Sequence, residues 1–243
     1  MPERDAVNVV LGAALVDVGG TLWPELGPPS DQQQRRLQDV AGLDHQQASR
    51  LAHALNTAVA SWESPTVLEQ DTQALIEETL RELDVANSDG RDVREAMCVP
   101  ASEGAALFPD AAQLLRTVAD LGLRTIIVSN TAWRDAEDYR RDFEFFGVSN
   151  HIHSIVTSLD VGFRKPHPSM FRAAFEASGC DPSECVVIGD SEEKDIAPAV
   201  AHGMRSILVA IERPPPAQSG AQAVATSLQN AGDILRKWTS AHP

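Results

Sequence analysis

The sequence predicts an α/β protein with a doubly wound parallel sheet and an all-helical segment inserted after the first strand. Two observations lead to this prediction. Short, nearly continuous apolar runs alternate with helical patterns, and one long stretch without strands interrupts the alternation. Buried parallel strands have continuous apolar runs because helices cover both faces of the sheet. Ligands of such sheets bind beyond the carboxyl ends of the strands.

Five short runs are predicted to be strands, and all but the third are nearly continuously apolar: Ala13–Val18, Thr125–Ser129, Ile152–Thr157, Cys185–Asp190 and Ser206–Ala210. Helical patterns lie between them at Asp110–Asp120, Ala136–Phe146, Ser169–Ser178 and Asp195–His202. A surface loop from Pro214 is expected to lead into a last helix near Asn230–Trp238. Strand–helix–strand repetition of this kind predicts a parallel sheet.

Residues 28–105 contain no convincing strand but have several helix-start signals, at Ser30, Asp44, Thr66 and Ser88 or Asp89. Apolar residues recur at helical spacing after the second of these signals, which indicates a packed face. We therefore expect residues 28–105 to form a helical domain, and residues 1–27 and 106–243 to form the α/β core domain.

Composition bounds the class of protein. The chain has 243 residues, of which 43% are hydrophobic, and this is enough for a core domain with a modest insert. Its 35 acidic and 20 basic residues give a formal net charge of −15. Nucleic-acid binding is therefore not expected, because it requires a basic surface to neutralise phosphates.

Cellular location is predicted from the cysteines and from missing targeting signals. No apolar run approaches the length of a membrane span, and the first ten residues lack the pattern of a signal peptide. Cys98, Cys180 and Cys185 have neither zinc-site nor CxxC spacing, so they are expected to be thiols in a reducing compartment. We expect a cytoplasmic protein without membrane contact, and either a monomer or a homodimer.

Chemically active side chains follow the predicted strands or precede a helix: Asp17, Ser129, Lys165, Asp190 and Asp195. Each alone is a common turn or cap residue, but together they are predicted to meet at the carboxyl edge of one sheet. Three acids grouped there would repel one another without a cation, and Mg²⁺ is the natural partner for carboxylates and phosphate oxygens. Ser129 and Lys165 could surround an anion while Asp17 attacks it.

Four segments together resemble the motifs of the haloacid dehalogenase-like (HAD) hydrolase superfamily, in the same order: VDVGGTL, IIVSN, GFRKPHP and VVIGDSEEKD. The resemblance covers essentially the whole chain and implies a Rossmann-like core. Residues 28–105 resemble the helical cap of the C1-capped branch.

The resemblance also implies roles for individual residues. Asp17 would be the nucleophile that forms an aspartyl-phosphate, and Lys165 would share in catalysis. The phosphoryl group would be bound by Thr21, Ser129, Asn130 and Lys165. Mg²⁺ would be held by Asp17, the backbone carbonyl of Gly19, Asp190 and, further out, Asp195. The implied substrate is a small phosphorylated metabolite.

Position 19 departs from the phosphatase pattern of the superfamily. That pattern has a second aspartate two residues after the nucleophile, where this sequence has Gly19. The aspartate serves as general acid and base, a role that typically contributes about 10²–10⁴-fold to the rate. Phosphatase activity is therefore expected to be weak unless Glu25, Glu103 or the substrate itself supplies the proton.

Alternative functions remain open at this point. A metal-independent haloacid dehalogenase would need no acid at position 19 and could receive the halide at Arg35, Arg36 or Arg50. A catalytically impaired module that binds phosphate and Mg²⁺ would also tolerate Gly19. Phosphonate cleavage through a cap lysine is disfavoured, because no lysine precedes Lys165. The magnesium pattern places Mg²⁺-dependent phosphate hydrolysis first.

Overall fold

The computed structural model describes residues 10–24, 30–62, 71–85 and 88–240. Six strands form one parallel sheet in the order β3-β2-β1-β4-β5-β6. They are β1 (Ala13–Val16), β2 (Arg124–Ser129), β3 (Ser154–Thr157), β4 (Cys185–Gly189), β5 (Arg205–Val209) and β6 (Ala223–Ala225). The predicted doubly wound α/β fold is confirmed.

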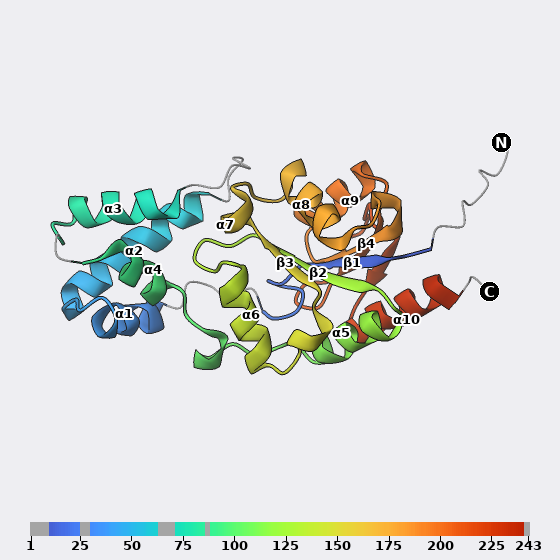
Figure 1. The fold of residues 1–243 in the computed structure, drawn as a ribbon, viewed down its shortest axis with the longest axis horizontal. Helices are drawn as coiled ribbons and strands as arrows, with labels where there is room; N and C mark the ends of the chain where they lie inside the picture. The colour runs from blue at the N-terminus through green and yellow to red at the C-terminus, as the bar shows by residue number, and fades with distance from the viewer. Residues whose placement is uncertain (1–9, 25–29, 63–70, 86–87, 241–243) are drawn as a thin grey trace.

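Helices cover both faces of the sheet, as Figure 1 shows. On one face lie α5 (Ala111–Asp120), α6 (Ala136–Phe145) and α10 (Leu228–Ser240), and on the other lie α8 (Pro168–Ser178) and α9 (Ala197–Ala201). Alternate residues of β1 point to opposite faces, as strand geometry requires. Ala14 and Val16 pack with the first group of helices, whereas Ala13 and Leu15 pack with the second. Both faces of β1 are therefore buried.

The structure differs from the sequence prediction in three elements. The short strand β6 falls in the stretch predicted to be a loop, and three residues bounded by polar and glycine positions give too little pattern to predict a strand. The short helix α7 (Ser158–Val161) was also not predicted. The helix predicted at Asp195–His202 is present as α9, but it is shorter than predicted and follows a wider π-helical turn, Glu192–Ile196.

Between β1 and α5 the described chain contains a group of α-helices and no strand of the sheet. This insert contains α1 (Ser30–Asp39), α2 (His45–Ser61), α3 (Thr72–Glu82) and α4 (Gly90–Met97). Asp44 caps α2 with a capping box and Asp89 caps α4, as predicted. The predicted helix start at Thr66 lies outside the described residues. The four helices bury a core of their own, which includes Leu37, Leu51, Leu55, Ile76 and Val93.

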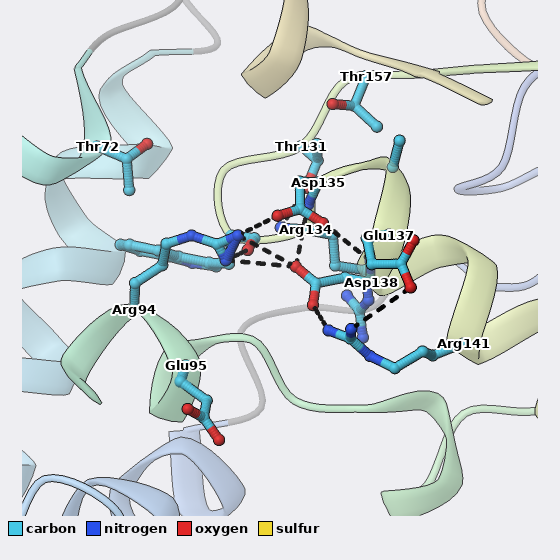
Figure 2. Close-up of polar contacts among 12 residues, drawn as sticks. Thr72, Arg94, Glu95, Thr131, Arg134, Asp135, Glu137, Asp138, Arg141 and Thr157 are labelled. Carbon is cyan, nitrogen blue, oxygen red and sulfur yellow. Dashed lines mark hydrogen bonds and ion pairs between the residues drawn. The ribbon is translucent and has the colours of Figure 1, made fainter. Parts of the chain in front are cut away.

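Ion pairs join the insert to the α/β core (Figure 2). Arg94 of α4 donates to Asp135 at 2.5 Å and lies 3.3 Å from Asp138; these acids are the N-cap and third residue of α6. The hydroxyl of Thr72 donates to the backbone carbonyl of Ala132 at 3.2 Å. Because these partners are half-buried or buried, the pairs constrain the position of the insert over the sheet more than exposed pairs would.

The chain segment that returns from α4 to α5 is also held by the core. The backbone N–H of Ala101 donates to Asp142 of α6 at 2.7 Å, and Arg134 donates to the backbone carbonyl of Val99 and to Asp142.

In the described parts of the chain, we find no helix with the length and apolar character needed to cross a membrane.

Candidate active site

A cavity of about 910 Å³ lies between the insert and the carboxyl ends of the strands. The sheet order places β1 next to β4, where the order of the strands reverses. Doubly wound sheets bind ligands at such a reversal, because the loops diverge there and leave a crevice. The core lines the cavity with Asp17, Gly19, Ser129, Lys165 and Asp190, among others. The insert lines it with Gln32, Gln33, Asn56, Val59, Ala60 and Met97.

Asp17 follows the last residue of β1 and is 8% exposed. Its backbone N–H donates to the carbonyl of Ile188 at 2.9 Å, which extends the pairing of β1 with β4. Its carboxylate accepts two hydrogen bonds, from the Thr21 hydroxyl at 2.9 Å and from the Lys165 ammonium at 2.6 Å. Both oxygens of this buried acid are therefore held in fixed positions.

Lys165 joins three separate elements of the core. Its Nζ donates to Asp17 at 2.6 Å, to Asp195 at 2.7 Å and to the backbone carbonyl of Val128 at 2.9 Å. The side chain is 3% exposed. Burial by itself lowers the pKa of Lys165, but the nearby charges of Asp17 and Asp195 outweigh it, so the net shift raises the pKa. The lysine is therefore cationic at neutral pH.

Asp17, Asp190 and Asp195 form a group of acids that could hold a cation. One carboxylate oxygen of each lies within 4.8 Å of the others. Two glycines make room for the group. A Cβ atom on Gly20 would lie 2.5 Å from Asp190, and one on Gly189 would lie 2.5 Å from Asp195. This all-oxygen donor set fits Mg²⁺, which prefers carboxylate ligands.

The charge of Asp195 depends on its neighbours. Burial raises the pKa of Asp195 to about 6, with a further rise from Asp17, while Lys165 acts in the opposite direction. Its second oxygen accepts a hydrogen bond from the backbone N–H of Ser191 at 3.2 Å. Asp195 therefore shares the Lys165 ammonium with Asp17.

Ser129 is the last residue of β2 and Asn130 follows it, at the same edge of the sheet. The Ser129 hydroxyl is buried and lies 2.9 Å from the hydroxyl of Tyr139. The Asn130 amide binds the backbone of Lys165 at both ends, accepting from its N–H at 2.7 Å and donating to its carbonyl at 3.0 Å. The Asn130 side chain thus anchors the loop that carries Lys165.

A family model of haloacid dehalogenase-like hydrolases matches residues 11–203, which is most of the chain. The chain belongs to the haloacid dehalogenase-like hydrolases. The predicted family is therefore confirmed.

Among the relatives of this HAD-like hydrolase are phosphatases. A phosphoserine phosphatase of Thermus thermophilus is 28% identical over 153 residues, which cover 63% of this chain and 57% of the relative. A phosphoglycolate phosphatase of Rhodospirillum rubrum is 31% identical over 134 residues, 54% of each chain. The chain thus spans little more than half the length of these relatives.

Solved structures share the fold over nearly the full chain. A HAD phosphatase from Thermococcus onnurineus has a TM-score of 0.62 at 20% identity and covers 93% of this chain and 98% of its own. A 2-haloacid dehalogenase from Pseudomonas syringae has a TM-score of 0.66 at 19% identity, and the match covers 94% of this chain and 100% of the dehalogenase chain. Because a phosphatase and a dehalogenase match comparably, the fold does not choose between the two reactions.

Of the residues predicted for the site of this HAD-like hydrolase, most meet at the cavity. Asp17, Gly19, Ser129, Asn130, Lys165, Asp190 and Asp195 line it. Thr21 is not among the lining residues; it is fully buried and donates to Asp17 from behind.

The side chains considered as proton donors in place of an acid at position 19, and those considered as halide receptors, are not found at the cavity. Glu103 is paired with Arg36 at 2.6 Å and does not line the cavity. Glu25 lies outside the described residues. Arg35 and Arg50 are exposed, and none of the three arginines proposed as halide receptors is among the cavity's lining residues.

Sequence reasoning missed several cavity residues, among them Trp23, Gln33, Asn56 and Tyr139. Three of them lie in or near helices whose pattern is explained by core packing. Gln33 is 2% exposed and donates to the carbonyl of Met97. Tyr139 is the single tyrosine of the chain, but nothing in its spacing indicates that it meets Ser129.

Proposed function

We propose that this HAD-like hydrolase is a Mg²⁺-dependent phosphatase of small phosphorylated metabolites, with Asp17 as nucleophile. The grouping of Asp17, Asp190 and Asp195 beside Lys165 carries the proposal. A dehalogenase of this family needs no such group of acids. The phosphoserine and phosphoglycolate phosphatases among the relatives support a phosphate ester as the substrate.

In this proposal Asp17, Asp190 and the backbone carbonyl of Gly19 would hold Mg²⁺, with Asp195 further out. When bound, the ion would supply positive charge that stabilises the phosphoryl oxygens during transfer. Insert residues 28–105 would act as a cap over the core of residues 1–27 and 106–243. The three free cysteines support the expected cytoplasmic location.

The chain's own groups divide the remaining work. A carboxylate oxygen of Asp17 forms a bond to phosphorus as the ester P–O bond breaks, and the leaving group departs either as an anion or with a proton that the substrate itself carries. Water then attacks the phosphorus, which releases phosphate and restores Asp17. Ser129 and Lys165 donate to the phosphoryl oxygens. Since Lys165 already has three acceptors, it must exchange one of them for the substrate.

Two side chains act indirectly in this scheme. Asn130 supports anion binding by anchoring the backbone of Lys165. Thr21 orients Asp17 through its hydroxyl. Both are predicted to affect substrate binding through the residue that they hold.

The proton for the leaving group is the weak point of the site. Gly19 has no carboxylate, and the ion pair with Arg36 keeps Glu103 away from the cavity. We therefore propose that the natural substrate has a leaving group that departs without protonation or that carries its own acid. Gly19 also favours a second candidate, a module that binds phosphate and Mg²⁺ without turnover.

A panel of phosphate esters and haloacids, assayed with Mg²⁺ and with EDTA, tests the proposal. Phosphate release that requires Mg²⁺ and disappears in Asp17→Asn would support it. Halide release that EDTA does not affect would contradict the proposal and favour a metal-independent dehalogenase. If neither product forms but inorganic phosphate binds in the presence of Mg²⁺, the second candidate is favoured.

A further inference from the structure

The hydroxyl groups of Ser129 and Tyr139 form a buried pair at the floor of the cavity. Ser129 is the last residue of β2, and Tyr139 lies in the second turn of α6. Their oxygens are 2.9 Å apart, within the range of a good O–H···O hydrogen bond. The two residues are 2% and 5% exposed, and both line the cavity.

The ring of Tyr139 is held from several sides. It stacks on Trp23 with ring centroids 5.7 Å apart and an interplanar angle of 19°. The ring centroid of Phe143, one turn further along α6, lies 6.1 Å from the ring centroid of Tyr139. The guanidinium carbon of Arg134 is 5.9 Å from the ring centroid. Because the ring is fixed by packing, the position of its hydroxyl is fixed as well.

The direction of the hydrogen bond follows from what each hydroxyl can do. A serine hydroxyl has one proton to donate and can also accept. A phosphoryl oxygen is an acceptor, so Ser129 can bind it only by donating its proton. Tyr139 must then be the donor to Ser129. Burial raises the pKa of the Tyr139 phenol, so it keeps its proton at neutral pH.

The other acceptor near Ser129 is a poor one. Its hydroxyl lies 3.4 Å from the backbone carbonyl of Asn130, a long contact for O–H···O geometry. An incoming phosphoryl oxygen can therefore take the Ser129 proton at little cost, provided that Tyr139 continues to donate to the serine oxygen.

We propose that Tyr139 is a positioning residue that orients the Ser129 hydroxyl toward a bound phosphoryl oxygen. This inference rests on the proposed function, since it assigns Ser129 to phosphoryl binding. It adds a residue for which the sequence motifs give no indication. Tyr139 acts through Ser129, and its own hydroxyl does not exchange a proton with the substrate.

The test uses Tyr139→Phe, Ser129→Ala and the double variant of the full chain. Calorimetry measures the affinity of each variant for inorganic phosphate in the presence of Mg²⁺. Steady-state kinetics with the best phosphate ester give kcat and KM. Tyr139→Phe keeps the ring packing and loses the hydroxyl. We expect it to weaken phosphate binding and kcat/KM by about tenfold. In the Ser129→Ala background the same change should have an effect of less than about twofold.

Two controls separate positioning from packing. Phe171→Leu removes a buried ring from the core on the other face of the sheet and no hydroxyl, so it should lower the melting temperature and leave the phosphate affinity within about twofold. Because the chain has one tyrosine, tyrosine labelled with ¹³C at Cζ gives a single NMR signal. That signal should shift when phosphate binds to the wild type, and much less in Ser129→Ala.

The outcomes distinguish the inference from the proposed function. If Ser129→Ala weakens phosphate binding but Tyr139→Phe does not, the inference is wrong while the proposed function stands. Equal losses from Tyr139→Phe in both backgrounds would also overturn it, because Tyr139 would not then act through Ser129. If the wild type neither binds phosphate nor hydrolyses an ester, the proposed function fails and the inference fails with it.

Discussion

The ammonium group of Lys165 lies 2.6 Å from Oδ1 of Asp17, although 148 positions separate the two residues in the sequence. The same nitrogen lies 2.7 Å from Asp195. One buried cation therefore holds two buried anions, one directly after β1 and one in the π-helical turn that follows β4. Removing one partner from such a group leaves unpaired charge in a place with little water, and this is costly.

Lys165→Met should lower the free energy of unfolding by about 3 kcal/mol, because Asp17 and Asp195 would then face each other without a cation. Urea denaturation without metal measures this loss. Adding Asp195→Asn should restore part of it by removing one of the two negative charges. Lys237→Met, at an exposed position of α10, is the matched control and should change stability little. Equal effects at both lysines would contradict the prediction.

Asp17→Asn should reduce phosphate-ester hydrolysis to below about 1% of wild type, since an amide does not form the acyl-phosphate bond. The substitution is nearly isosteric, so the circular dichroism spectrum and the fold should persist. Initial rates with the best ester from the panel measure the effect. Residual activity well above this level in purified variant would remove Asp17 from the role of nucleophile.

Millimolar Mg²⁺ should raise the melting temperature, because a ligand that binds the folded state stabilises it by mass action. Asp190→Asn should remove most of this increase and Asp195→Asn a smaller part, whereas Asp120→Asn, at an exposed position of α5, should leave it unchanged. A melting temperature that is indifferent to Mg²⁺ in the wild type would count against the metal site.

The increase due to Mg²⁺ should shrink as the pH falls from neutral to about pH 5. Burial raises the pKa of Asp195 to about 6, so in that range the metal competes with a proton on this carboxyl. Without metal, the stability of the protein should depend on pH in the opposite direction. The contribution of Asp195 to stability is fully present below its unfolded pKa and is lost as the pH rises through about 6. Melting temperatures measured across this pH range, with and without Mg²⁺, check both pH dependences. Asp195→Asn should reduce both of them.

Gly19→Asp should be tolerated and should increase activity, whereas Gly20→Ala should not be tolerated. A Cβ atom on Gly19 meets no atom within 4 Å, but one on Gly20 would lie 2.5 Å from Asp190 at a φ of +72°. The added carboxylate can protonate a leaving group, so alkyl phosphates should gain up to about 100-fold and p-nitrophenyl phosphate little. Equal gains for the two esters, or none, would show that protonation is not the missing step.

Arg94→Gln should raise KM about fivefold, because it loosens the contact between the insert and α6, and both of these contribute residues to the cavity. Figure 2 offers the matched control in Arg141, which binds Asp138 from the same helix and does not reach the insert. Arg141→Gln should leave KM unchanged. Limited proteolysis should cleave Arg94→Gln faster than either the wild type or the control.

Sequence patterns were enough to predict the fold class, most of the helices and strands, and several residues at the carboxyl edge of the sheet. Apolar runs such as Cys185–Asp190 are local patterns, and parallel strands necessarily bring their carboxyl ends to one edge. For that reason Asp17, Ser129 and Asp190 could be predicted to lie near one another before any contact was known.

Local patterns did not predict which side chains pair with one another and which line the cavity. Thr21 and Glu103 were candidates for the substrate or for the proton, yet Thr21 is buried behind Asp17 and Glu103 pairs with Arg36. The bond of Tyr139 to Ser129 depends on where α6 packs against the end of β2. Spacing along the chain sets the period of an element, but the direction of a side chain between two elements is set by their packing, which no local pattern encodes.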